Sequence, residues 1–479
     1  MLKQIQLKAG ERFDEARIVR SGAIDESIEA TVADIIATVR AEGDAALLRL
    51  TERFDGAELD SLQVSEAEVQ AAYDAIASDL LGTLKLAAAR IRDFHERQRE
   101  QSWFTVERPG VLLGQKVTPL ARVGIYVPGG RANYPSTVLM NAVPAAVAGA
   151  GRIAMATPPA RDGSILPATL VAADLAGVNE IYKVGGAQAI AAFAYGTPTI
   201  AAVDKITGPG NAWVAAAKKL VQGRVGIDMI AGPSEVLVLA DATARAPQVA
   251  IDLMAQAEHD PRAAVFLVTT QAGLIAPVED ALEELLERSP REEITRAALT
   301  DNSYAIVCAD LEQAVQVCNV IAPEHLEVLC AEPFELLGRL DNAGAIFLGP
   351  WTPEPVGDYL AGPNHTLPTQ GTARFSSPLT VDDFVKRTSV LQYSQEALRQ
   401  DSEEIRRFAA AEGLWAHGEA VRLRVEEQED PLSCHCEAAK RPENAPVERF
   451  QRSSRCVRSH DEAIQQPAET SKTQEGGER

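Results

Sequence analysis

The opening third of the chain has the spacing of amphipathic helices. In residues 27–54, SIEATVADIIATVRAEGDAALLRLTERF, apolar positions recur every three or four residues with charges between them, which is the period of a helix with one buried face. A second such stretch begins at Ser65, where Ser65 and Glu68 have the spacing of a capping box. Between residues 103 and 120 the pattern becomes short, alternating and punctuated by glycine and proline, which predicts strands and a crossing between domains.

The middle of the chain repeats a strand, a glycine turn and a helix. Residues 122–233 contain four such units, which open with VGIYVPGG, RIAMATPP, IYKVGG and KITGPG. A second series follows, with the apolar strands EVLVLAD, AVFLVTT, YAIVCAD and GAIFLGP and helical stretches between them. Short β-rich runs that alternate with helices predict parallel sheets. We therefore expect an α/β protein with two doubly wound, incomplete Rossmann-like domains and small N-terminal and C-terminal helical elements.

The pattern changes again after residue 347. A long loop rich in proline and glycine, GPWTPEPVGDYLAGPNHTLPTQGTARFSSP, contains Asp358 and His365, and loops of this length tend to be functional or disordered. We favour a functional loop, followed by a final pair of helices from VDDFVKR onward, and then a polar, aperiodic tail that we expect to be disordered. The expected boundaries are an N-terminal segment (1–20), the helical part of a first α/β domain (21–103), crossing strands (104–121), a second α/β domain with the glycine turns (122–233), the remainder of the first domain (234–375), a C-terminal helical domain (376–425) and the tail (426–479).

Composition narrows the class of protein. The 479 residues carry 46 basic and 68 acidic side chains, a formal net charge of −22, which disfavours nucleic acid or an anionic membrane as a partner. There is no uninterrupted apolar run long enough for a transmembrane helix and no apolar core of a signal peptide near the start. Six cysteines, three of them in the polar tail, do not form a disulfide framework. We expect a large, acidic, cytoplasmic enzyme.

Four residues in the second half of the chain offer nitrogen and oxygen ligands for a metal. Gln256 and His259 are three residues apart in DLMAQAEH, so both side chains lie on one helix face. Asp358 lies in the long loop, and His417 follows Glu412 by five residues. Together the four ligands would suit Zn²⁺, Mn²⁺ or Co²⁺. The alternatives are a surface histidine that caps a helix and an Asx turn at the aspartate; no CxxC or HExxH spacing decides between them.

Adjacent acid/base groups occur at Glu324 and His325, in IAPEHLEV. Such a pair could supply two proton-transfer groups to one site. The side chains would need a turn or a helix start, because successive residues of a strand point to opposite faces. An exposed polar turn explains the pair equally well.

Three glycine turns of residues 122–233 lie between a strand and a helix start. They are PGG (128–130), GGAQ (185–188) and GPGN (208–211), whereas the G-x-G-x-x-G fingerprint is absent. Backbone N–H groups at such helix starts favour anions, and ligands of open α/β sheets bind at the carboxyl ends of the strands. Three turns in one block indicate a nucleotide site, and tight packing is the alternative for each turn alone.

The cysteines and the remaining histidines carry no assigned chemistry. Cys308, Cys318 and Cys330 lie in or beside apolar stretches, which is typical of buried structural thiols. His95 and His460 have strongly polar neighbours in the sequence, and we assign them no role.

Several longer motifs resemble those of one enzyme family. GPGNAWVAAAK, IDMIAGPSEVLVLAD, DLMAQAEHD, APEHLEV, GPWTPEPVGDYLAGPNHTLPT, GTARFSSPLTVDDFVKR and AEGLWAH occur in the order found in histidinol dehydrogenases, from about residue 10 to about residue 425. The resemblance implies oxidation of L-histidinol to L-histidine in two NAD⁺-dependent steps, the last of histidine biosynthesis, with the aldehyde kept on the enzyme. It also implies a homodimer whose sites are completed by the partner's C-terminal helices.

The resemblance carries roles onto individual residues. It implies one zinc ion per subunit, held by Gln256, His259, Asp358 and His417. It implies Glu324 and His325 as the acid/base pair, and Ser234, Glu412 and His365, with His325 and the zinc ligands, as substrate contacts. Tyr126, Gln188 and Asn211 match positions at the NAD site.

The chemistry of the reaction agrees with these roles. An alcohol needs a base as hydride leaves, which suits His325 near neutral pH, and the aldehyde must be hydrated before its oxidation, which suits Glu324. The tail after residue 428 extends past the family pattern, as an appendage or as read-through of the coding sequence. Two further hypotheses are a dehydrogenase of another amino alcohol on this fold and an inactive paralogue that acts as a binding subunit.

Overall fold

The computed structural model describes residues 1–20, 25–129 and 134–426, in two compact units. The first unit comprises Met1–Tyr393 and the second begins at Ser394. The predicted disordered tail lies outside the described residues, except for Glu426, which ends a helix. Within the described stretches, no helix is both long and apolar enough to cross a bilayer.

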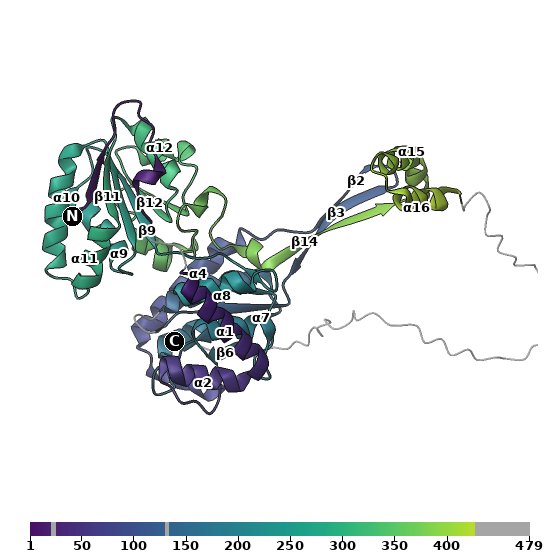
Figure 1. The fold of residues 1–479 in the computed structure, drawn as a ribbon, viewed down its shortest axis with the longest axis horizontal. Coiled ribbons are helices and arrows are strands. Elements are labelled where there is room, and N and C mark those ends of the chain that lie inside the picture. The colour runs from purple at the N-terminus through teal and green to yellow at the C-terminus, as the bar shows by residue number, and fades with distance from the viewer. Residues whose placement is uncertain (21–24, 130–133, 427–479) are drawn as a thin grey trace, which may run out of the picture. The chain divides into compact units, whose positions relative to one another are not determined.

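The first unit contains a six-stranded, fully parallel sheet (Figure 1). In spatial order its strands are β1 (Lys3–Gln6), β11 (Ser303–Val307), β10 (Ala264–Thr269), β9 (Glu235–Ala240), β12 (His325–Leu329) and β13 (Ala345–Leu348). Every residue of β9 and β10 is buried, as expected where helices cover both faces of a parallel sheet. The N-terminal segment, expected over residues 1–20, adds the edge strand β1 to this sheet, and the 3₁₀ turn η1 (Glu15–Arg17) follows it.

Helices cover both faces of this six-stranded sheet. One face packs on α9 (Ala246–Ala257), α10 (Ile275–Leu286) and α11 (Glu292–Asp301), and the other on α12 (Leu311–Ile321) (Figure 1). Alternation along β9 divides its side chains accordingly, with Val236 and Val238 in one apolar cluster and Leu237 and Leu239 in the other. Two short helical turns, α13 (Pro333–Leu336) and η3 (Leu337–Arg339), connect β12 to β13.

A second parallel sheet of the first unit has five strands. In spatial order they are β6 (Glu180–Lys183), β5 (Arg152–Thr157), β4 (Arg122–Tyr126), β7 (Lys205–Thr207) and β8 (Gly226–Ile227). One face packs on α1 (Glu26–Glu42), α2 (Asp44–Asp55), α7 (Gly186–Tyr195) and α8 (Ala212–Val221). The other face packs on α3 (Glu66–Ala75), α4 (Ser78–Glu96), α5 (Pro135–Ala148) and α6 (Pro167–Ala176).

The helices of the opening third therefore cover the five-stranded sheet. This differs from the expected grouping of residues 21–103 with residues 234–375. An apolar stripe shows that a helix must be buried, but it does not indicate which of two sheets covers it. The predicted capping box at Ser65 is present and begins α3.

A three-stranded antiparallel sheet completes the first unit, in the order β14 (Val385–Tyr393), β3 (Val111–Pro119) and β2 (Trp103–Arg108). The strands expected over residues 103–120 are confirmed. The helix expected from VDDFVKR onward is wrong, because residues 385–393 pair along their full length with β3. Only the short turn η6 (Val381–Phe384) is helical there. Pairing with a distant strand outweighs local helix preference at this position.

The second unit is a pair of helices, α15 (Gln395–Ala411) and α16 (Trp415–Glu426). Ser394 caps α15 by accepting a hydrogen bond from the Ala397 N–H. Helices near the C-terminal end of the described chain are thus confirmed, although they begin at residue 395 instead of 376.

Candidate active site

Glu324 and His325 lie at the amino edge of the six-stranded sheet. His325 is the first residue of β12 and Glu324 directly precedes the strand, so strand alternation does not separate their side chains. Both are buried, and the Glu324 carboxylate lies 4.0 Å from His325 Nδ1. The sequence predicts a turn or a helix start at this pair. The structure instead places Glu324 just before β12 and His325 at its first residue.

One residue of the adjacent strand β9 binds both groups. The N–H of Glu235 donates to Glu324 Oε2 at 2.9 Å, and His325 Nδ1 donates to the Glu235 carbonyl oxygen at 3.1 Å. A carbonyl can only accept, so in the neutral ring Nδ1 carries the proton and Nε2 is the basic nitrogen. Nε2 is buried and has no hydrogen-bond partner among the described residues. It is therefore available to a substrate proton.

The environment of Glu324 favours its neutral form. Burial raises the pKa of its carboxyl to about 8, and the nearby Glu354 and Glu235 carboxylates contribute in the same direction. His325 and the hydrogen bond from Glu235 lower this pKa but do not offset burial. A carboxyl that titrates near pH 8 is suited to act as a general base on water.

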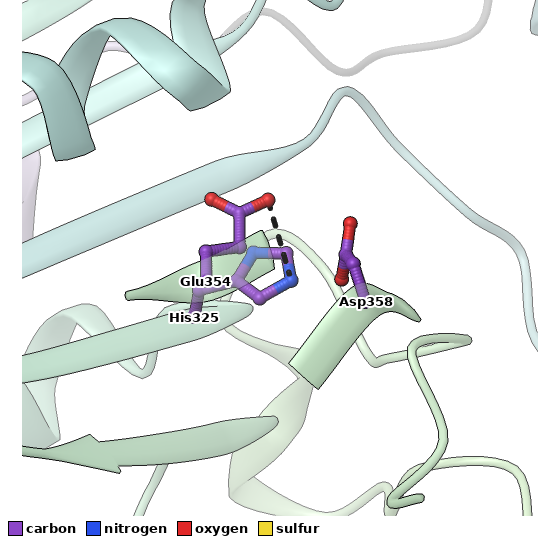
Figure 2. Close-up of side chains that lie close together, drawn as sticks. All are labelled: His325, Glu354 and Asp358. Carbon is purple, nitrogen blue, oxygen red and sulfur yellow. Dashed lines mark ion pairs between the residues drawn. The ribbon is translucent and has the colours of Figure 1, made fainter. Parts of the chain in front are cut away.

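Glu354 was not predicted, and it lies beside the basic nitrogen of His325. Its Oε1 is 3.9 Å from His325 Nε2, and ligand atoms of His325, Glu354 and Asp358 lie within 4.8 Å of one another (Figure 2). The Glu354 N–H at the start of α14 (Glu354–Val356) donates to Glu327 Oε1 at 2.8 Å. Burial, followed by the Asp358 charge, raises the pKa of Glu354 well above its ordinary value. The side chains of His325, Glu354 and Asp358 are therefore close enough to share a proton or a cation.

Three of the four predicted zinc ligands belong to the first unit and have the chemistry of a metal site. Gln256 is in the last turn of α9, and its Oε1 is buried without a hydrogen-bond partner in the described chain. His259 follows α9 and is exposed at the surface. Desolvation by neighbouring atoms nevertheless lowers the pKa of its imidazole, which favours the neutral form that binds a metal. Asp358 lies in the π-helical turn η4 (Gly357–Ala361). An orphaned amide oxygen, an imidazole and a carboxylate fit Zn²⁺.

Charges and short distances connect two of these ligands, His259 and Asp358, to His325. The pKa of His259 responds first to desolvation and then to the charges of Asp358 and His325. His365 Nδ1 lies 3.9 Å from Asp358 Oδ1, and burial lowers the pKa of His365. Ser234 directly precedes β9 at the same edge of the sheet. Glu412 and His417 belong to the second unit, where both side chains are exposed, so the geometry of the first unit does not include them.

A cavity of about 410 Å³ adjoins Asp358 and His365. Its other walls include apolar side chains from α4, β13 and the long loop, among them Phe94, Phe347 and Leu367. A mostly apolar cavity with a few polar groups is typical of a small-molecule site.

The predicted NAD residues lie at the carboxyl edge of the five-stranded sheet. The strand order reverses between β4 and β7, where ligands of doubly wound sheets bind. Tyr126 ends β4, and its hydroxyl accepts a hydrogen bond from the Gly186 N–H at 3.1 Å, at the start of α7. Gln188 lies buried in the first turn of α7. The PGG turn falls partly outside the described residues, because 130–133 are not described.

Asn211 caps the N-terminus of α8 and is exposed. Its side-chain oxygen accepts hydrogen bonds from the Trp213 and Val214 N–H groups, so its amide N–H₂ remains to donate outward. An exposed amide donor near a topological switch point fits the phosphates and riboses of a dinucleotide.

Comparison with known proteins decides the family. The family model for histidinol dehydrogenase matches residues 19–425. The chain belongs to the histidinol dehydrogenase family. It is 55% identical over 413 residues to the histidinol dehydrogenase of Geobacillus kaustophilus (strain HTA426), which covers 86% of this chain and 97% of that protein.

Other histidinol dehydrogenases agree. The enzyme of Geobacter sulfurreducens is 53% identical over 413 residues, which cover 86% of this chain and 96% of the relative. The crystal structure of histidinol dehydrogenase from Elizabethkingia anophelis superposes with a TM-score of 0.84 at 37% identity, covering 90% of this chain and 99% of that one. The predictions of the histidinol dehydrogenase family, of an oxidoreductase and of an α/β fold are confirmed.

The structure corrects the interpretation of His95, to which the sequence analysis of this histidinol dehydrogenase family member assigned no role. Its side chain is fully buried, not set among polar groups as the neighbouring sequence indicates. Nδ1 donates to the Ile91 carbonyl at 2.9 Å, and Asn364 Nδ2 lies 3.3 Å from Nε2. Asn364 precedes His365, so His95 anchors the loop that carries a predicted substrate contact. The sequence signal for this burial is the spacing on α4: His95 follows the apolar Ile91 by four residues, so both side chains lie on the same, buried face of the helix.

The cysteine interpretation is confirmed. Cys308, Cys318 and Cys330 are buried free thiols. Burial raises the pKa of Cys308 and of Cys330 to about 12, so neither forms the thiolate that nucleophilic chemistry needs.

Proposed function

We propose that this protein oxidises L-histidinol to L-histidine through enzyme-held L-histidinaldehyde, with two NAD⁺ as hydride acceptors, as the last steps of histidine biosynthesis in the cytoplasm. The observation that carries the proposal is the buried pair of Glu324 and His325, held by one residue of β9 with the basic His325 nitrogen left free. Membership of the histidinol dehydrogenase family supports the choice of substrate.

In the first oxidation, His325 Nε2 removes the hydroxyl proton of the alcohol. The hydride on the adjacent carbon passes to NAD⁺, so that the alcohol becomes an aldehyde and one NADH forms. The hydrogen bond from His325 Nδ1 to the Glu235 carbonyl stabilises the resulting imidazolium and keeps the ring oriented.

In the second oxidation, the Glu324 carboxylate accepts a proton from a water molecule that attacks the aldehyde carbon. His325, after releasing its first proton to solvent, takes a proton from the hydrate while the hydride of the hydrate passes to a second NAD⁺, which yields the carboxylate. Burial of both side chains excludes other water from the reacting carbon. One pair of groups thus serves two chemically different steps.

Gln256, His259 and Asp358, with His417 of the partner subunit, would hold a zinc ion. When bound, zinc would orient the substrate's imidazole and amine. Ser234, His365 and the partner's Glu412 would complete the substrate site. Tyr126, Gln188 and Asn211 would bind NAD⁺. We therefore propose a homodimer with zinc and NAD⁺ as cofactors and with neither nucleic acid nor a membrane as a partner.

Stoichiometry tests the proposed function. The purified protein is assayed for NADH formation with limiting L-histidinol, with and without a chelator. We expect two NADH per histidinol, loss of activity with the chelator and recovery with Zn²⁺. Turnover of another amino alcohol but not of histidinol would favour the alternative substrate. NADH and histidinol binding without turnover would favour a binding subunit.

A further inference from the structure

A buried ion pair holds the GPGN turn (208–211). Lys218 and Asp228 form an ion pair, and their side chains are 2% and 1% exposed. Lys218 Nζ also donates to the Gly208 carbonyl oxygen at 2.8 Å, and the Gly208 N–H donates to Asp228 Oδ2 at 2.8 Å. The two members of one ion pair therefore hold the peptide groups on both sides of Gly208.

Gly208 lies against the end of β4 at the proposed cofactor crevice. Its φ is +110°, and a Cβ there would lie 2.0 Å from the Tyr126 carbonyl oxygen. The Tyr126 hydroxyl accepts from the N–H of Gly186 at the start of α7. Tyr126 thus contacts the GPGN turn through its backbone and the GGAQ turn through its side chain, so a shift of Gly208 would alter the spacing of the two turns.

The two ends of the turn are held differently: Asn211 accepts hydrogen bonds from the Trp213 and Val214 N–H groups of α8, whereas both peptide groups of Gly208 are bonded by the ion pair. Strand β7 ends at Thr207, and α8 begins only at Ala212. Lys218 lies nearly two turns into α8, and Asp228 directly follows β8, so the ion pair connects the turn to two elements that follow it in the chain. Charges this deeply buried are stable only with their full set of partners. Gly208 is therefore restricted to the position in which its carbonyl oxygen reaches Lys218 and its N–H reaches Asp228.

We propose that Lys218 and Asp228 are positioning residues that hold the GPGN turn in the conformation that binds the dinucleotide cofactor. The inference rests on the proposed use of NAD⁺ at the five-stranded sheet. Loss of the pair weakens cofactor binding through misplacement of the turn. It leaves histidinol binding unchanged, because the residues proposed for histidinol lie at the six-stranded sheet and in the second unit.

The variants are Lys218→Met, Asp228→Asn and the double variant. A single substitution leaves one buried charge unpaired, which can prevent folding, whereas the double variant leaves none. The matched control is Glu180→Gln, which breaks the pair that Glu180 forms with Arg122 at the opposite, amino edge of the same sheet. Each protein is titrated with NADH by fluorescence in the absence of histidinol, and the KM values for NAD⁺ and histidinol are then measured.

We expect the double variant to raise the Kd for NADH and the KM for NAD⁺ by about tenfold to a hundredfold. Its KM for histidinol, and both cofactor values of Glu180→Gln, should stay within about twofold of the unsubstituted protein. Unchanged NADH affinity in the folded double variant, equal weakening in the control, or failure of the double variant to fold would overturn the inference. Absence of NADH binding by the unsubstituted protein would overturn the proposed cofactor as well.

Discussion

Replacing Glu324 by glutamine tests the division of labour within the acid/base pair. The substitution keeps the size of the side chain, and the amide oxygen can still accept the hydrogen bond from the Glu235 N–H. It removes the only function assigned to the carboxylate, which is to take a proton from water. The first oxidation should therefore survive, and the second should be impaired.

The pKa of Glu324 sets the magnitude. With a pKa of about 8, roughly a tenth of the groups are ionised at pH 7 and about nine tenths at pH 9. General-base catalysis contributes about 10²-fold to 10⁴-fold, so the loss in aldehyde oxidation should be of that order at pH 9 and about tenfold smaller at pH 7. Because His325 acts in both steps, its effect cancels when aldehyde oxidation is divided by alcohol oxidation.

The assay compares the two half-reactions between pH 7 and pH 9. NADH formation is followed with histidinol in single turnover and with supplied histidinaldehyde. In the unsubstituted protein the ratio of aldehyde to alcohol oxidation should rise about tenfold over this range, and in Glu324→Gln it should stay flat. Equal loss in both half-reactions, or the same rise in the variant, would refute the role of Glu324. His325→Asn, as a comparison, should depress both steps.

Three further predictions concern the metal, the cofactor turn and the fold. Gln256→Ala removes the orphaned ligand oxygen, so zinc per subunit, measured by elemental analysis, should fall at least tenfold, a value within the range for lost coordination support; full zinc retention would contradict the assignment. Gly208→Ala places a Cβ 2.0 Å from the Tyr126 carbonyl at a φ of +110° and should cost about 3 kcal/mol or more in urea unfolding. Ser65→Ala removes the cap of α3 and should cost about 1 kcal/mol with activity unchanged; a loss of activity would show that α3 matters to the site.

The local pattern of apolar and polar residues was sufficient to predict whether most elements are helices or strands. The strands β9 and β10 are continuous apolar runs, buried on both faces, and such runs have few alternatives in an α/β chain. The stretch from VDDFVKR onward forms a strand and not the predicted helix, because the residues of β14 are stabilised by pairing with β3, more than 260 positions earlier in the chain. Local propensity carries no information about such a partner.

The residues of the candidate site also fall into two groups, those that sequence motifs indicate and those that only the tertiary structure reveals. Motifs resembling the family led to the proposal of Glu324, His325 and four zinc ligands. Glu354 was not among them, because it lies in TPEPVG, where nothing periodic distinguishes a buried acid from a loop residue. Its proximity to His325 depends on the hydrogen bond that joins its N–H to Glu327. Similarly, Lys218 reads as one more charge on a helix, and only the fold shows that its ammonium is buried with Asp228.

By itself, the sequence determined the α/β class, most strands and helices and the family, and it supplied the proposed site residues, because periodicity and motif depend on neighbours in the chain. Tertiary structure alone decided which sheet the first four helices cover, that one residue of β9 binds both Glu324 and His325, and that the Glu324 pKa rises to about 8. These properties depend on desolvation and on contacts between residues far apart in the chain, and both arise only when the sheets are packed.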